Sequence, residues 1–153
     1  MTTFYIATIK CEKTMKSGAV KRVSEKLLVD ANSFTECEAM VTEYMQPQEF
    51  EVAGIAKTKY CELIRKYTVN EEGKRECEVN GDESFFGVKV CFMMLDEKSG
   101  EDKKSYTDLL VFAKDIDDAR CMVVKAMKGT LADYTIESLK KTNIVNYVSL
   151  LDK

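Results

Sequence analysis

The sequence contains no histidine and no tryptophan, and Pro47 is its only proline. Without histidine, catalysis by a Ser-His or Cys-His pair and metal binding through imidazole are excluded, and the commonest general base is missing. An enzyme would have to work with carboxylates, lysine or a thiolate, and no motif singles out such a group. We therefore predict a non-enzymatic protein that uses no cofactor.

Long apolar runs are also missing. No stretch of about 18 apolar residues occurs, so the sequence predicts no membrane-spanning helix. The first residues lack the basic segment and the apolar core of a secretory signal, and we expect a cytoplasmic protein, in which disulfides are rare. The formal net charge of -3 argues against a protein that binds duplex DNA by neutralising many phosphates.

What the sequence does contain is an internal repeat. A shift of 82 residues, which places Ser17 on Ser99, aligns residues 17–45 with residues 99–127 without a gap. Each copy has the pattern of a strand, a turn, a strand, a helix and a strand. We therefore predict an α+β fold formed by tandem duplication of a β-β-α-β unit, with pseudo-twofold symmetry and antiparallel sheets covered by two helices.

The first copy indicates where its elements begin and end. Residues 4–11 predict a strand, and residues 21–31 predict the return strand of a hairpin. Ser33, followed three residues later by Glu36, matches a capping box, so we expect a helix that begins at Ser33 and ends before Pro47.

The third strand of each copy contains the same irregularity. In residues 50–56 the apolar alternation slips by one position at Gly54, and the matching segment slips between Ile136 and Leu139, around Ser138. A slip at the same place in both copies predicts a β-bulge. Ile136 and Leu139 are also compatible with a short helix.

The repeat suggests how the chain is divided. We predict a first unit over residues 1–60, a linker over 61–83 with a short strand at Leu63 and Ile64, and a second unit with a C-terminal tail over 84–153. Because about 60 residues are marginal for independent folding, the two units are expected to share a core in one compact domain. The apolar residues of the tail predict that it docks on the domain itself.

The six cysteines invite a metal hypothesis, but none of them forms the C-x2-C or C-x4-C pair that zinc sites contain. The 82-residue shift places four of them opposite hydrophobic residues: Cys11 opposite Met93, Cys91 opposite Ile9, Cys37 opposite Ala119 and Cys121 opposite Ala39. We therefore interpret the cysteines as core residues and expect no metal site.

An acidic cluster, Asp115, Asp117 and Asp118, has two interpretations. Carboxylates in this arrangement can bind a hard cation, but they also stabilise the first turn of a helix. Because the matching positions of the first copy form the capping box at Ser33, we favour an aspartate cap at Asp115.

Basic residues gather around both hairpins and in the linker. They are explained most simply as solvated faces, but lysine or arginine beside tyrosine can also hold a phosphate while the ring stacks on a base. The candidate ligand-binding residues are Lys21, Arg22, Lys103, Lys104, Tyr106, Arg65 and Tyr67. No glycine-rich phosphate loop is present, which argues against a nucleotide-hydrolysing enzyme.

Residues 25–39, 95–100 and 128–134 resemble the recurring patterns of a small-protein family, domain of unknown function 4494, found in Bacteroidales bacteria and their phages. The resemblance covers most of the chain and departs from it mainly over residues 65–84. It implies a phage or mobile-element context and no site residues.

These observations lead to one functional hypothesis and two alternatives. The first is a phage counter-defence factor that sequesters a small anionic, nucleotide-type signalling molecule, in a pocket between the units or between subunits of a homo-oligomer. The second is a protein-interaction module that docks on a host or virion protein. The third is a protein that binds single-stranded nucleic acid.

Overall fold

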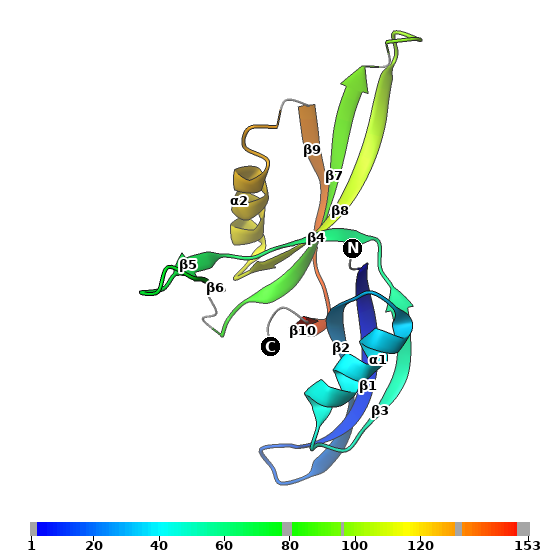
Figure 1. Ribbon diagram of the computed structural model, residues 1–153, viewed down its shortest axis with the longest axis vertical. Coiled ribbons are helices and arrows are strands. Elements are labelled where there is room, and N and C mark those ends of the chain that lie inside the picture. Colours follow the sequence, from blue (N-terminus) through cyan, green and yellow to red (C-terminus); the bar gives the residue numbers. More distant parts are fainter. Residues whose placement is uncertain (1–2, 78–80, 96, 131–132, 150–153) are drawn as a thin grey trace. The chain divides into compact units, whose positions relative to one another are not determined.

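The computed structural model describes residues 3–77, 81–95, 97–130 and 133–149 (Figure 1). These residues form two helices, two four-stranded sheets and one two-stranded sheet, which confirms the predicted α+β class. The chain divides into two compact units, Met1–Lys59 with Asn143–Lys153 (unit 1) and Tyr60–Thr142 (unit 2). No helix within the described ranges is long and apolar enough to cross a membrane.

Unit 1 is a four-stranded sheet with a helix on one face (Figure 1). Its elements are β1 (Thr3–Thr14), β2 (Val20–Ala31), α1 (Phe34–Met45), β3 (Phe50–Lys57) and β10 (Ile144–Ser149). The strand order is β10-β2-β1-β3. Alternate side chains of β1 and β2 point to the helix, since strand residues two apart share a face. Together with α1 they form the core, in which Ala7, Ile9, Val29, Cys37 and Val41 are fully buried.

Unit 2 has a sheet of the same order, β4-β8-β7-β9. Its elements are β4 (Tyr60–Ile64), β7 (Ser84–Leu95), β8 (Asp102–Ala113), α2 (Ile116–Ala126) and β9 (Asp133–Lys141). Its core contains the buried residues Val88, Val90, Leu109, Val111 and Val123.

A small hairpin follows β4 in unit 2. Its strands are β5 (Tyr67–Val69) and β6 (Arg75–Cys77), which pair with each other in a separate two-stranded sheet. Asn70 closes the turn, because its side-chain Oδ1 accepts hydrogen bonds from the backbone N–H groups of Glu72 and Lys74 at 3.0 and 2.9 Å.

Each unit takes one edge strand from the chain segment that follows the third strand of the other unit. After β3 the chain leaves unit 1 and adds β4 to the sheet of unit 2, and after β9 it returns and adds β10 to the sheet of unit 1. Both added strands are parallel to their neighbours, so the prediction of purely antiparallel sheets is wrong at these two edges. Residues 61–83, predicted as a linker, thus include part of a sheet strand, and the described part of the tail is a strand of unit 1.

The chain passes from one unit to the other twice, after β3 and after β9, and a threonine makes the same two hydrogen bonds at each of these crossings. The backbone N–H and the hydroxyl of Thr58 both donate to the carbonyl of Phe4, at 3.0 and 2.8 Å. The same two groups of Thr142 donate to the carbonyl of Phe85, at 2.9 and 2.7 Å. Each crossing therefore begins from a point that is tied to the sheet the chain is leaving.

Both helices begin as their sequences predict. The hydroxyl of Ser33 accepts a hydrogen bond from the N–H of Glu36 at 3.1 Å, and Asp115 accepts one from the N–H of Asp118 at 2.7 Å. The carboxylate of Glu36 reaches back to the N–H of Asn32, one residue before the cap. The predicted capping residues are confirmed, with the return hydrogen bond of the box displaced by one residue.

The predicted bulges are also confirmed. In the pairing of β1 with β3, Thr8 lies opposite Gly54 and Ile9 opposite Val52, so one residue of β3 is skipped. In the pairing of β7 with β9, the register shifts in the same way between Lys89 and Val90. Ile136 and Leu139 belong to a strand, which excludes the alternative of a short helix.

The strand registers correct the predicted equivalence of the cysteines. The second strands and the helices correspond at a shift of 82 residues, but Thr3 and Ser84, which pair with Ala31 and Ala113, correspond at a shift of 81. The reason is that the loop after β7 is one residue longer than the loop after β1. Cys11 therefore corresponds to Phe92, and Cys91 corresponds to Lys10.

Burial separates the cysteines into two groups. Cys11, Cys37 and Cys91 are buried, as predicted, whereas Cys61 and Cys121 are exposed, so the core interpretation is wrong for these two. The side chain of Cys77 lies outside the described residues. Among those residues, no group of three or more Cys, Asp or Glu side chains has an arrangement that could hold a metal ion.

Candidate functional site

The predicted ligand-binding residues fall in three separate places. Lys21 and Arg22 lie on β2 of unit 1, and Lys103, Lys104 and Tyr106 lie on β8 of unit 2. Arg65 and Tyr67 lie at the junction between β4 and β5, also in unit 2.

The basic pair on β2 does not make a concentrated positive site. The guanidinium Nη2 of Arg22 forms an ion pair with Oε2 of Glu51 at 2.6 Å. The small cavity beside it, about 220 Å³ in volume, is lined by two basic residues and three glutamates, namely Lys10, Arg22, Glu12, Glu49 and Glu51. This surface is therefore poorly suited to an anion.

The three residues on β8 do not all face the same side of the sheet. Lys103 shares the face of Leu109 and Val111, which point to the helix, whereas Lys104 and Tyr106 lie on the opposite face. A lysine of the neighbouring strand β7 lies over Tyr106: Nζ of Lys89 is 5.0 Å from the centre of the Tyr106 ring. The β8 residues thus supply a half-exposed aromatic ring with a nearby cation.

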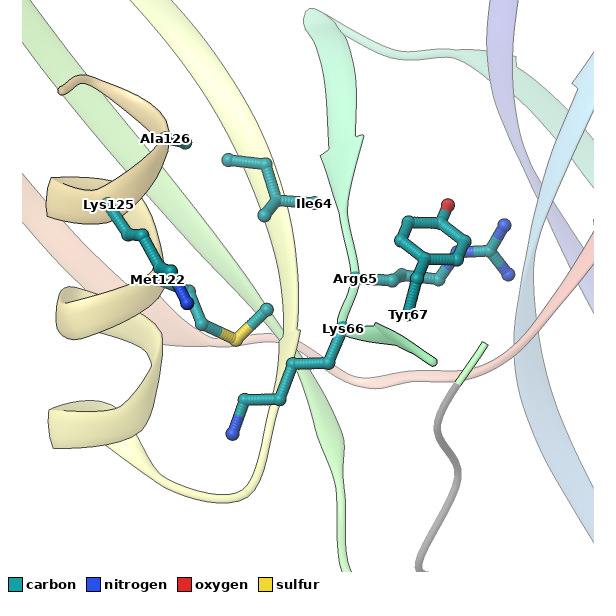
Figure 2. Close-up of a pocket in the computed structure, with 7 residues that line it drawn as sticks. All are labelled: Ile64, Arg65, Lys66, Tyr67, Met122, Lys125 and Ala126. Carbon is teal, nitrogen blue, oxygen red and sulfur yellow. The ribbon is translucent and has the colours of Figure 1, made fainter. Parts of the chain in front are cut away.

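Arg65 and Tyr67, in contrast, line a cavity of about 460 Å³ between the end of β4 and the second half of α2 (Figure 2). Its floor is apolar and consists of Ile64, Met122 and Ala126. Two lysines that the sequence did not single out, Lys66 from the strand side and Lys125 from the helix, complete the lining. The lining therefore combines three basic residues and a tyrosine with three apolar residues.

The strand geometry explains why these side chains diverge. Ile64 is the last residue of β4 and packs against the core of unit 2, which fixes the position of the three residues that follow. Figure 2 shows the Arg65 side chain beside the ring of Tyr67 and the Lys66 side chain extending in another direction, toward α2. The guanidinium carbon of Arg65 lies 5.6 Å from the centre of the Tyr67 ring, within the range of a cation–π contact.

Lys66 is held in place by the first turn of α2. Its Nζ donates to Oδ1 of Asp118 at 2.8 Å, and Oδ2 of the same carboxylate accepts a hydrogen bond from the backbone N–H of Lys114 at 3.0 Å. The hydrogen bond from Lys114 and then that from Lys66 lower the pKa of Asp118 below its ordinary value of 3.8. Asp118 is therefore a carboxylate at neutral pH, and it links the start of the helix to the cavity.

The corresponding place in unit 1 has different chemistry. The registers of β4 and β10 make Val148 the counterpart of Ile64, because these residues lie opposite Val29 and Val111. At the helix positions that hold Lys125 and Ala126 in unit 2, unit 1 has Glu43 and Tyr44. The cation is replaced by an acid and the small residue by a large one.

Tyr44 is engaged by the edge strand of its own unit. Its hydroxyl oxygen accepts a hydrogen bond from the side-chain amide of Asn146 on β10. The residue that follows Val148, at the position of Arg65, is the buried Ser149. Unit 1 therefore lacks the basic cavity of unit 2 at the positions that the structure describes.

A second depression, the α2–β9 groove, lies between α2 and the start of β9. It has a volume of about 640 Å³, and its lining is mostly apolar, with a basic rim. The lining residues are Arg120, Cys121, Val124, Lys125, Met127, Lys128 and Tyr134. Lys125 borders both this groove and the cavity beside β4.

Comparison with known proteins gives a family and nothing more specific. The family model described as Domain of unknown function (DUF4494) matches residues 3–150, and the chain belongs to this family. A search of curated proteins found no match. A search of solved structures found no match either.

Proposed function

We propose that the protein is a non-enzymatic binding protein that takes a small anionic ligand, of nucleotide type, in the cavity beside β4. The observation that carries this proposal is a cavity whose lining combines three basic residues, Arg65, Lys66 and Lys125, with an apolar floor. Cations recognise phosphate oxygens through charge-assisted hydrogen bonds, and the apolar floor suits a base or sugar.

The size and the aromatic content of the cavity support the same ligand class. Its volume of about 460 Å³ lies within the usual range for small-molecule pockets. Tyr67 is 41% exposed, so part of its ring is accessible for stacking, with Arg65 close to it.

The residues of unit 1 at the positions that correspond to the cavity support a ligand site that is specific to unit 2. We propose that the two units arose by tandem duplication and that a pseudo-twofold relation links their strands, on the basis of their common strand order, caps and bulges. After such a duplication, Lys125 and Ala126 distinguish the copy that binds a ligand from the copy that carries Glu43 and Tyr44. In a phage context, the ligand would be a nucleotide signal of host defence, held by sequestration rather than turned over.

Isothermal titration calorimetry of the full chain tests the proposal. The probes are nucleoside monophosphates, cyclic dinucleotides and adenosine diphosphate ribose, each titrated at about 0.15 M salt, where weak surface attraction is screened. We expect at least one probe to bind with a micromolar dissociation constant. Binding no tighter than millimolar for every probe would overturn the proposal.

Two substitutions taken from unit 1 locate the site. Lys125→Glu replaces a cation by the acid of unit 1 and is expected to weaken binding by at least roughly tenfold, the value of one charged hydrogen bond. Ala126→Tyr is expected to fill the floor and to weaken binding to a similar degree. Lys21→Glu is the matched control, because it makes the same change of charge in unit 1. If Lys104→Glu abolished binding and Lys125→Glu did not, the site would lie on β8 instead.

The α2–β9 groove favours a second candidate function, docking of a partner protein. Its apolar lining and basic rim fit an amphipathic helix with acidic side chains. Val124 is exposed at the middle of this face and would be the main apolar contact. Val124→Asp should then abolish capture of an acidic helical peptide and leave nucleotide binding unchanged. Single-stranded nucleic acid, the third possibility, would instead bind with a steep dependence on salt.

A further inference from the structure

We infer that Asp118 sets the charge of the ligand: through Lys66 it favours ligands with a single phosphate group over polyphosphates. This inference rests on the proposed function, because it concerns the same cavity. Asp118 does not itself line the cavity. It acts through Lys66, and we therefore regard it as a positioning residue.

The contacts of Asp118 place a negative charge next to one of the three cations. Its Oδ1 accepts the hydrogen bond from Nζ of Lys66 at 2.8 Å, and only 18% of its side chain is exposed. One of the three lining cations therefore already has a carboxylate as its partner. Arg65 and Lys125 line the cavity at other positions.

A partly buried carboxylate affects ligands according to their charge. Two charges about 8 Å apart interact by roughly 1 kcal/mol in a medium of intermediate polarity, and each further negative charge on the ligand adds another such repulsion. A triphosphate has about two more negative charges than a monophosphate. Asp118 should therefore disfavour the triphosphate by roughly tenfold or more relative to the monophosphate.

Asp118 does more than helix capping requires. The counterpart in unit 1, Glu36, also accepts a backbone hydrogen bond at the start of its helix, from the N–H of Asn32. The cap proper is Asp115, which accepts from the N–H of Asp118. The contact with Lys66 is therefore an addition to the local helix start, and it extends the influence of this carboxylate to the cavity.

The test compares adenosine mono-, di- and triphosphate, without divalent cations, on the full chain by calorimetry at constant ionic strength. For the natural sequence we expect the monophosphate to bind at least as tightly as the triphosphate. In Asp118→Asn, which keeps the size of the side chain, the affinity for triphosphate relative to monophosphate should rise by roughly tenfold. A role in helix stability alone would not change this ratio.

Asp117→Asn is the matched control. It removes the same charge one residue away, from a side chain that is 88% exposed and pairs with Arg120 at 3.7 Å, and it should leave the ratio unchanged. Lys66→Met provides a second measurement if Asp118→Asn folds poorly, since loss of this cation should weaken all three nucleotides.

The outcomes separate the inference from the proposed function. A triphosphate that binds the natural sequence more than tenfold tighter than the monophosphate, or a ratio that does not change in Asp118→Asn, would overturn the inference and leave the binding function intact. An equal effect of Asp117→Asn would also overturn it, because the charge effect would then not depend on the contact with Lys66. Failure of all three nucleotides, together with the other probes, to bind would remove the proposed function itself.

Discussion

Unit 1 and unit 2 have the same framework and differ at the positions where a ligand could be held. Both have a sheet of the same strand order, a capped helix on one face and a bulge in the third strand. In the second half of the helix, however, unit 1 has Glu43 and Tyr44 where unit 2 has Lys125 and Ala126. The comparison separates residues that build the framework from residues that are free to specialise.

A second difference between the units lies in the contact between the edge strand and the first strand of each repeat. Gly87 on β7 leaves room for the side chain of Tyr60, whose hydroxyl lies 3.0 Å from where a Cβ at this glycine would be. The registers make Ile6 the counterpart of Gly87 and Ile144 the counterpart of Tyr60. Unit 2 thus has a small and a large residue, Gly87 and Tyr60, at the positions where unit 1 has two residues of medium size. Side-chain volume is therefore balanced locally in each unit.

The most disruptive test of the comparison is a pair of core substitutions on the two edge strands. Ile64→Ala should destabilise unit 2 by roughly 2–4 kcal/mol, and Val148→Ala should destabilise unit 1 by roughly 1–3 kcal/mol, because each removes apolar contacts with its core. Hydrogen exchange followed by mass spectrometry should show faster exchange in β7 and β8 for the first variant and in β1 and β2 for the second. The reverse pattern would contradict the exchange of edge strands.

The next test concerns the balance of volumes. Gly87→Ile introduces the residue of unit 1 and should cost roughly 1–3 kcal/mol, because the side chain overlaps Tyr60. Combining it with Tyr60→Ile should restore part of this loss, as measured by urea denaturation. If the double variant were less stable than the sum of the two single changes predicts, the two residues would not compensate each other as they do in unit 1.

A smaller effect is expected from pH. The pKa of Asp118 is lowered in the folded chain, so its carboxylate stabilises unit 2 at pH values above 3.8, the ordinary pKa of this group. This stabilisation is lost as the pH falls through the lower pKa of the folded chain. The difference in unfolding free energy between the natural chain and Asp118→Asn should be on the order of 1 kcal/mol at pH 7 and should disappear in acid. Glu36→Gln is the matched change in unit 1. The hydrogen bond described for the Glu36 carboxylate comes from the N–H of Asn32 and not from a lysine, so we expect a smaller effect.

The last test uses thiol labelling of the natural chain and compares the two helices by the reactivity of their cysteines. Cys121 on α2 is exposed, whereas Cys37 on α1 is buried, and burial raises the pKa of the Cys37 thiol to about 11. At pH 8 a thiol reagent should modify Cys121 quickly and Cys37 only when unit 1 opens. Cys61 should react more slowly than Cys121, since desolvation raises its pKa and its thiol donates to the carbonyl of Asp108. Rapid labelling of Cys37 in the folded chain would contradict its burial.

Features with a local cause could be predicted from the sequence. The caps at Ser33 and Asp115 depend on a side chain and the N–H three residues later, so they are visible in a short window. The bulge near Gly54 is visible as a slip in alternation, which the second copy repeats. The offset of one residue in the first strands could not be predicted in this way, because the extra residue of the second hairpin loop lies just before the stretch that aligns without a gap.

The edge strands and the cavity depend on contacts between distant segments. Nothing in β10 itself determines whether it pairs with β2 or with another strand, since that choice depends on which sheet edge is within reach. Arg65 and Tyr67 could be singled out as a basic and aromatic pair, but Lys125 lies on a helix about 60 residues further along the chain and joins them only after β4 docks beside β8. A comparison of the copies at Lys125 and Glu43 was the one signal that could have found it.

The exchange of edge strands has a consequence for the order in which the chain can fold during synthesis. Unit 2 has all its strands once residue 142 has been made, whereas the sheet of unit 1 lacks β10 until residue 149 has left the ribosome. Until then, the edge of β2 from Lys26 to Asp30 has backbone groups that await their partner strand. Nascent domains usually complete themselves from the N-terminus onward, but in this chain the unit that begins first is the one that is completed last.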